Sequence, residues 1–87
     1  MSHRVDIESA ARRQMRNLPK VIMPRIDAAI RQLAEEPRPQ GCIQMAGYAD
    51  TYRIRVGDYR ILYRILDEVL VVLVVRIGHR REVYRHD

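Results

Sequence analysis

Three arginines near the middle of the chain are spaced to bind or stabilise negative charge. Residues 52–64 read as two alternating strands joined by a Gly57–Asp58 turn, a strong hairpin signal because glycine accepts the positive φ of such turns. The turn places Arg55 opposite Arg60, and residues two apart along a strand share a face. Arg53, Arg55 and Arg60 are therefore expected on one face. Guanidinium groups are permanently charged, planar donors that suit phosphate.

The opposite face of the hairpin is apolar and is expected to join the core. It carries Tyr52, Ile54, Val56, Tyr59, Ile61 and Tyr63. Like charges placed directly across a strand pair cost roughly 0.2–1 kcal/mol, and a site for a polyanion explains why this cost is tolerated. The competing interpretation is that such arginines are ordinary solvated residues on an outer sheet face. Arg64 falls on the same face and is interpreted as peripheral.

The C-terminal segment carries the other candidates for chemistry. Arg80 and Tyr84 lie within Gly78-His-Arg-Arg-Glu-Val-Tyr, and His79 is a candidate acid or base because histidine changes its charge near neutral pH. A lone histidine is more often incidental. Arg76 is expected on the helix-covered face or its rim, in a structural role. Scattered histidines and one cysteine without paired-ligand spacing predict no metal and no cofactor.

A strand and two helices are expected before the hairpin. Residues 3–7 alternate as a first strand, and Ser9 is expected to cap a short helix that breaks before Pro19. A second helix is expected over residues 20–35, where Pro24 is tolerable only in the first turn. Its apolar stripe at helical spacing comprises Ile22, Ile26, Ala29, Ile30 and Leu33.

The last strand is predicted over residues 69–77, after an Asp67–Glu68 turn and with Gly78 ending it. Because it is apolar at nearly every position, it is expected in the middle of the sheet with the first strand beside it. The fold class is therefore α+β, in the order strand-helix-helix-strand-strand-strand. Two N-terminal helices are expected to pack on one face of a small, mostly antiparallel sheet and to leave the other face partly open.

Composition favours a single basic globular domain over residues 1–87. The chain is 47% hydrophobic and 31% charged, which is typical of a folded protein and not of a disordered one. It carries 16 Lys and Arg against 11 Asp and Glu, a net charge of +5, and Lys20 is its one lysine. Such a charge suggests an acidic or nucleic-acid partner. The single Cys42 fits a reducing cytoplasm, and no apolar run is long enough to span a membrane.

Several motifs together resemble one family. The run Tyr52-Arg-Ile-Arg-Val-Gly-Asp-Tyr-Arg-Ile-Leu-Tyr, the apolar strand after it and Gly78-His-Arg-Arg-Glu-Val-Tyr-Arg resemble the RelE/ParE superfamily of bacterial and archaeal toxins. Leu18-Pro-Lys and Pro37-Arg-Pro match the same pattern, so the resemblance covers almost the whole chain. It implies a RelE-like, microbial ribonuclease-like fold and inhibition by a cognate RelB-like antitoxin. The toxin–antitoxin complex is then expected to bind its operator DNA.

Within this superfamily, the RelE branch cleaves messenger RNA in the ribosomal A site, whereas the ParE branch attacks DNA gyrase and generally lacks the ribonuclease residues. Here the RelE-type positions are occupied. Arg53 and Arg55 match the two basic residues of the first hairpin strand, and Arg60 matches the arginine after the turn. Arg80 matches the arginine after the glycine, and Tyr84 the tyrosine near the end. The resemblance thus predicts a toxin that is an endoribonuclease with these five catalytic residues.

The resemblance also assigns roles and leaves one open. Arg60 is assigned to the phosphate, Arg80 to the leaving-group side and Tyr84 to stacking on a base. Family members often carry lysine where Arg53 and Arg55 stand, and arginine does not readily lose its proton, so these two are interpreted as charge stabilisers. The proton acceptor stays open among His79, Tyr84 and a ribosomal group. Two alternatives remain: a gyrase poison, and a non-catalytic module that acts with its antitoxin on operator DNA.

Overall fold

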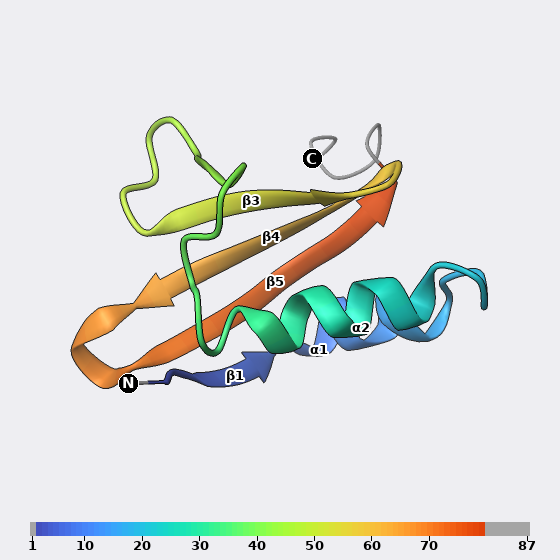
Figure 1. The fold of residues 1–87 in the computed structure, drawn as a ribbon, viewed down its shortest axis with the longest axis horizontal. Helices are drawn as coiled ribbons and strands as arrows, with labels where there is room; N and C mark the ends of the chain where they lie inside the picture. The colour runs from blue at the N-terminus through green and yellow to red at the C-terminus, as the bar shows by residue number, and fades with distance from the viewer. Residues whose placement is uncertain (1, 80–87) are drawn as a thin grey trace.

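The computed structural model describes residues 2–79 of the chain. The elements follow the predicted order with one additional short strand (Figure 1). They are β1 (Arg4–Ile7), α1 (Ser9–Arg16), α2 (Met23–Gln32), β2 (Ile43–Gln44), β3 (Thr51–Val56), β4 (Tyr59–Leu66), the 3-10 helix η1 (Asp67–Val69) and β5 (Val71–His79). No helix within this part of the chain is long and apolar enough to cross a membrane.

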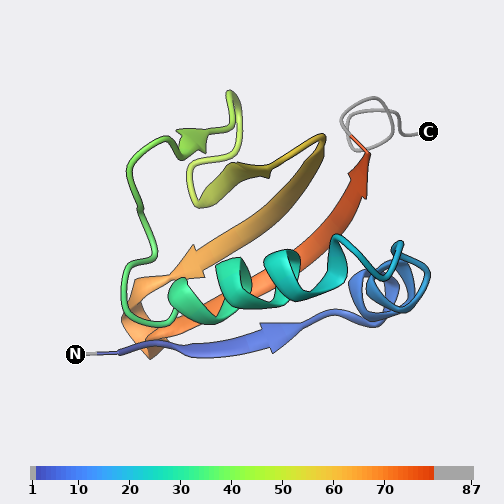
Figure 2. The ribbon, with the colours of Figure 1, turned by 45° about the vertical axis from the view of Figure 1, so that its right-hand side comes forward.

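The strands form one mixed sheet in the order β1-β5-β4-β3-β2. β1 runs parallel to β5, and the other neighbours are antiparallel. Both helices lie on the same side of this sheet, and within residues 2–79 the other side, which we call the uncovered face, carries no helical layer (Figures 1 and 2). The α+β class and the inner position of β5, between β1 and β4, are therefore confirmed.

The core lies between α2 and the helix-covered face of the sheet. Ile26, Ile30 and Leu33 of the predicted helical stripe are buried there, together with Ile61 and Val72 from the sheet. Tyr63 is also fully buried, and its hydroxyl donates a hydrogen bond to the carbonyl oxygen of Pro37 at 2.7 Å. This bond satisfies a polar group that would otherwise be costly to bury. Burial raises the pKa of Tyr63 above its ordinary value, so it stays a neutral donor.

The predicted hairpin register is confirmed. Val56 pairs with Tyr59 and Arg55 with Arg60 across a turn in which Gly57 has a φ of 61°. The six residues expected on the core side are all buried or packed against the core: Tyr52, Ile54, Val56, Tyr59, Ile61 and Tyr63. The three arginines consequently emerge on the uncovered face.

The N-terminal predictions need correction at their boundaries. β1 begins at Arg4, one residue later than expected, and Ser9 is the first helical residue and not a cap. Glu8 occupies the cap position because its backbone N–H donates to the carbonyl oxygen of Val74 at 2.9 Å, which prolongs the extended chain of β1. α2 spans ten residues instead of sixteen, with Pro24 in its first turn as required.

The last strand is displaced by two residues from its predicted range. Val69, which was expected to start the strand, is the last residue of η1, and Leu70 then takes a left-handed φ of 55°. Gly78 does not end the strand, since it pairs with Arg60 and the ladder continues to the pair of Tyr59 with His79. β2 was not predicted because a two-residue strand is too short to show an alternating pattern.

Candidate functional site

Near the hairpin turn, paired residues of β3, β4 and β5 form a grid of two rows on the uncovered face of the sheet. In one row Arg55 pairs with Arg60, which pairs with Gly78; in the next, Arg53 pairs with Leu62, which pairs with Arg76. Directly paired residues share a face, so four guanidinium groups belong to this grid. We call Arg53, Arg55, Arg60 and Arg76 the arginine cluster.

The place of Arg76 in this cluster corrects the prediction of the helix-covered face itself, although Arg76 also lines a pocket with Gln14 and Asn17 of α1, at the rim of that face. The ladder between β4 and β5 shifts register at Leu62 and Tyr63: Tyr63 pairs with Val74, but Leu62 pairs with Arg76, which leaves Val75 as an extra residue. Such a β-bulge exchanges the two faces of the strand beyond it. Alternation along β5 alone does not reveal this bulge, because it assigns Arg76 to the same face as the buried Val72 and Val74.

Three of the four arginines in the cluster carry positive charge that no carboxylate within residues 2–79 pairs with. Arg53, Arg55 and Arg76 form no ion pair with any described residue. The Nε atoms of Arg53 and Arg60 are buried, and that of Arg53 has no hydrogen-bond partner among the described residues. The arginine stems therefore pack along the sheet while the guanidinium groups reach outward, an arrangement common for long charged side chains.

Farther from the turn, arginines on the same face are paired with carboxylates. Both Nε and Nη2 of Arg64 donate to Oδ2 of Asp50, at 3.2 and 2.8 Å, and on β1 Arg4 pairs with Asp6 at 3.0 Å. The hydrogen bond from Arg64 lowers the pKa of Asp50. Arg64 does lie on the predicted face, but its charge is matched by a neighbour, in contrast to the charges of the cluster.

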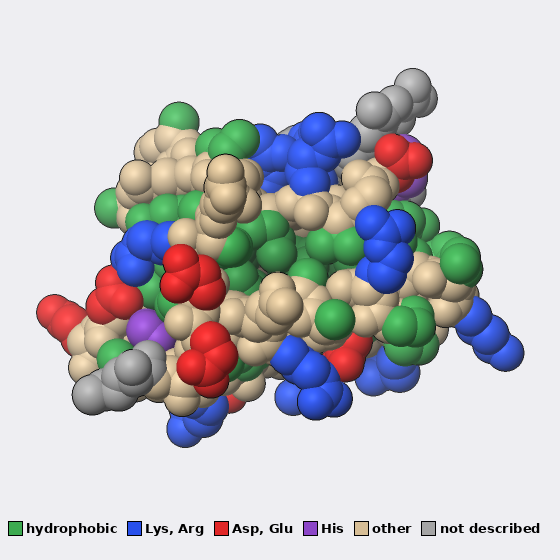
Figure 3. Space-filling view, viewed as in Figure 1, with side chains coloured by type: hydrophobic (Ala, Val, Ile, Leu, Met, Phe, Trp, Pro, Cys, Tyr) green, Lys and Arg blue, Asp and Glu red, His purple; other side chains and the backbone are tan. Residues whose placement is uncertain are grey.

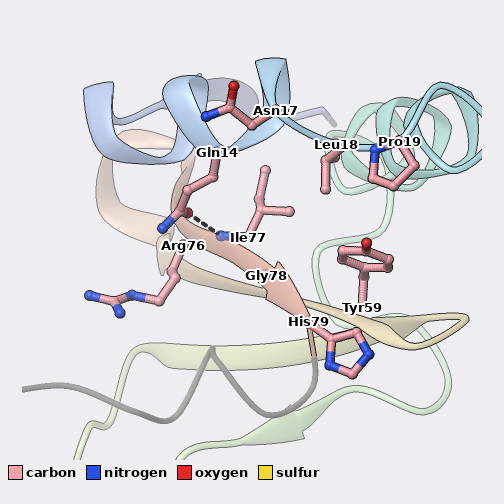
Figure 4. Close-up of a pocket in the computed structure, with 9 residues that line it drawn as sticks. All are labelled: Gln14, Asn17, Leu18, Pro19, Tyr59, Arg76, Ile77, Gly78 and His79. Carbon is pink, nitrogen blue, oxygen red and sulfur yellow. Dashed lines mark hydrogen bonds between the residues drawn. The ribbon is translucent and has the colours of Figure 1, made fainter.

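His79 lies on the sheet face opposite to Arg60, but it lines a pocket together with Arg76. It pairs with Tyr59, and the two rings meet edge to face with their centroids 5.7 Å apart. Both residues line an open pocket of about 360 Å³ that also includes Leu18 and Pro19 (Figure 4). In the same region Gln14 Oε1 accepts a hydrogen bond from the backbone N–H of Ile77 at 2.7 Å. His79 therefore belongs to a partly apolar pocket beneath α1.

Arg80 and Tyr84, the remaining predicted site residues, lie outside the described residues. The described part of the chain ends at His79, which follows Gly78, the direct partner of Arg60.

A second polar cluster occupies the opposite end of the sheet. Arg38 donates to Asp67 at 2.8 Å and to the hydroxyl of Tyr52 at 3.2 Å, and its guanidinium carbon lies 5.3 Å from the centre of the Tyr52 ring. His3 Nε2 lies 3.2 Å from the other carboxylate oxygen of Asp67. Arg38 and His3 together lower the pKa of Asp67. Arg38, His3 and Asp67 thus have their hydrogen-bond partners within the chain, which indicates a structural role for this cluster.

An apolar groove separates α2 from the edge of β3. It has a volume of about 710 Å³ and is lined mainly by Ala29, Leu33, Pro39, Ile54 and Val56, with Glu36 and Arg55 at its margin. Figure 3 shows the corresponding band of apolar side chains between the helix and the strand. No group of side chains within residues 2–79 is arranged to hold a metal ion.

Comparison with known proteins identifies the family. The profile of the family described as "ParE toxin of type II toxin-antitoxin system, parDE" matches residues 5–84. The toxin RelG of Mycobacterium tuberculosis is 35% identical over 86 residues, which cover 98% of this chain and 99% of that protein. The mRNA interferase toxin RelE of Escherichia coli is 28% identical over 88 residues, which cover 97% of this chain and 92% of that protein.

The fold agrees with these relatives. The archaeal RelE–RelB complex from Pyrococcus horikoshii contains a chain with a TM-score of 0.81 and 29% identity, covering 92% of this chain and 97% of that one. The chain is therefore a toxin of type II toxin–antitoxin systems that belongs to the RelE/ParE family, in its RelE branch.

Proposed function

We propose that this protein is a ribosome-dependent endoribonuclease that cleaves messenger RNA in the ribosomal A site and so inhibits translation. The observation that supports this most directly is the gathering of Arg53, Arg55 and Arg60 on an uncovered sheet face, with no carboxylate of the described chain paired to Arg53 or Arg55. The relative named mRNA interferase toxin RelE adds support from sequence. An RNA phosphate would be the anionic partner that Arg53 and Arg55 lack among residues 2–79.

The proposed reaction is a metal-independent internal transfer at phosphorus. The ribose 2′ oxygen forms a bond to the adjacent phosphorus as its proton passes to a base, and the bond from phosphorus to the 5′ oxygen breaks. The products are a 2′,3′-cyclic phosphate and a 5′ hydroxyl, which takes up a proton. Arg60 stabilises the charge that builds on the phosphoryl oxygens, and Arg80 acts on the leaving-group side. One such preorganised donor is worth about 3 kcal/mol of barrier.

Arg53 and Arg55 act in this proposal as further charge stabilisers, because an arginine keeps its proton at any working pH. Tyr84 stacks on an unpaired base and orients it for in-line attack. The pairing of His79 with Tyr59, away from the cluster, favours Tyr84 or a ribosomal group as the proton acceptor. An acid–base set completed by the ribosome would explain why cleavage depends on it.

The partner in this proposal is a RelB-like antitoxin, and the complex of the two binds operator DNA. The Pyrococcus horikoshii relative was crystallised with RelB. In this chain the net charge of +5 and the apolar groove beside α2 suit an acidic, amphipathic segment that folds as it binds.

The decisive test is the substitution Arg60→Ala. Induced expression of the wild-type chain without antitoxin should arrest growth, and primer extension should reveal newly cut transcripts. Arg60→Ala should lower the cleavage rate about 100-fold or more, the usual effect of losing one such donor. Arg64→Ala is the matched control, because it removes an arginine from the same strand and face that Asp50 already neutralises.

Both variants should remain folded, with cooperative unfolding and a yield similar to that of wild type. The proposal fails if folded Arg60→Ala protein cuts transcripts as fast as wild type, or if wild-type expression arrests growth while transcripts stay intact.

The family description itself favours a second candidate, a gyrase poison of the ParE type. This alternative predicts DNA breaks and blocked replication before any change in translation. A DNA-damage reporter, followed alongside radiolabelled amino-acid incorporation in the first minutes after induction, separates the two. Early loss of incorporation without the reporter signal supports the ribonuclease, and the reverse order supports the gyrase poison.

A further inference from the structure

We propose that Arg76 is an additional substrate-binding residue, which holds an RNA phosphate next to the one that is cleaved. This inference rests on the proposed ribonuclease function and adds a contact that the family motif does not supply. The inference depends on the β-bulge in β5. Without the extra residue Val75, alternation would place Arg76 on the core face with Val72 and Val74, and the bulge moves it to the uncovered face. Bulges that redirect a side chain are common beside active sites.

The position of Arg76 fits a flanking phosphate. Arg53 and Arg76 are the two direct neighbours of Leu62, so their backbones lie about 10 Å apart across three strands. The row that contains Arg60 lies two residues away, about 7 Å along the strands. Beside Arg60, the corresponding position on β5 is Gly78, which has no side chain to fill the space. An RNA backbone crossing Arg60 can therefore meet Arg76 at the neighbouring row.

The surroundings of Arg76 favour an external partner. No ion pair joins it to any carboxylate among residues 2–79, although its side chain is half-buried. Figure 4 shows Ile77 directed toward Leu18, while the guanidinium group of Arg76 extends away from both. A structural arginine in a thin fold would be expected to have an internal partner, as Arg38 has in Asp67.

The test is the salt dependence of RNA binding by the full chain. Each phosphate contact to a single strand contributes about 0.7 to the slope of log K against log salt. Arg76→Gln should therefore lower the slope by about 0.7 and weaken binding of a labelled ten-nucleotide single-stranded RNA about fivefold at 0.1 M salt. Arg76→Lys, which keeps the charge, should retain most of the slope.

Arg31→Gln serves as the control for net charge. It removes one positive charge from α2, where Arg31 is paired with Asp27 at 2.7 Å, and should leave the slope unchanged. Equal loss of slope in Arg31→Gln and Arg76→Gln would overturn the assignment, as would an unchanged slope in folded Arg76→Gln. Equal weakening by Arg76→Gln and Arg76→Lys without a slope change would indicate a structural role and would overturn it too.

A cell-free translation reaction separates this inference from the proposed function. If wild type cuts ribosome-bound message while Arg76→Gln binds and cuts equally well, only the role of Arg76 is wrong. If wild type neither binds RNA nor cuts message, both proposals fail.

Discussion

Arg55 and Arg60 face each other across the ladder of β3 and β4, although like charges in direct pairs are unfavourable. Asp50 relieves the charge of Arg64 on the same face, but no described carboxylate does so for Arg55. At the scale of single residues, the chain therefore keeps an arrangement that costs stability, which anion binding by these arginines, as proposed above, would explain.

Replacing Arg55 with threonine should separate these two effects. Arg55→Thr should raise the free energy of unfolding by about 0.5 kcal/mol, because it removes a repulsive cross-strand pair and introduces a residue that favours strands. The same variant should cut ribosome-bound message more slowly. Urea unfolding and the cell-free cleavage rate measure the two quantities, and a loss of stability in this variant would contradict the explanation.

The residues of the hairpin could be predicted from sequence because one turn type sets the register of both strands. Arg53, Arg55 and Arg60 consequently appear on the predicted face. The face of Arg76 could not be predicted in this way, since the bulge depends on how β5 pairs with β4 and leaves no mark in the alternation of β5 alone. The roles of all these arginines in catalysis stay predictions.

At the scale of elements, the cluster depends on the turn that sets the register of β3 and β4. Gly57 adopts a φ of 61°, a conformation that is unfavourable for residues with a side chain. Its position also lies close to α2, since a Cβ atom there would come within 3.5 Å of Nη1 of Arg25. That distance is an ordinary contact, so strain in the backbone is the dominant effect of a substitution.

Gly57→Ala should therefore lower the free energy of unfolding by about 1 kcal/mol. Gly57→Asn should cost less, because asparagine tolerates left-handed backbone better than alanine. Chemical denaturation of the three proteins under identical conditions tests this order. Equal stability of the alanine variant and wild type would show that the turn readily adopts another conformation.

Element boundaries were harder to predict than element types. The helix pattern identified α2 and its buried stripe, but its ends depend on tertiary contacts and on Pro24. Likewise Glu8, and not Ser9, occupies the cap of α1 because a hydrogen bond to β5 keeps it extended. Both differences come from contacts between segments that are distant in sequence, which local patterns do not contain.

At the scale of the whole molecule, the cluster around Asp67 joins three distant parts of the chain. Asp67 in η1 contacts His3 before β1 and Arg38 in the loop after α2. The hydrogen bonds from Arg38 and His3 lower the pKa of Asp67 in the folded state. Its contribution to stability is thus present above its unfolded pKa, about 3.9, and is lost as the pH falls through the lower folded value.

Asp67→Asn should accordingly be less stable than wild type at pH 6, with a difference that shrinks as the pH falls toward 3. Urea unfolding of both proteins at a series of pH values measures this convergence. Asp27→Asn on α2 is a suitable control, since its i to i+4 pair with Arg31 lies on one helix and joins no distant segments. A difference between Asp67→Asn and wild type that stays constant across this range would refute the linkage.

The direction of β5 has a practical consequence for anyone preparing this protein. Its first residues lie beside η1, whereas its last residues, Gly78 and His79, lie opposite Arg60 and Tyr59 (Figure 1). A fluorescent label attached at His79 would therefore lie at the edge of the arginine cluster. A label placed before Ser2 would start at the far end of the sheet, next to β1, and is the safer choice for activity measurements.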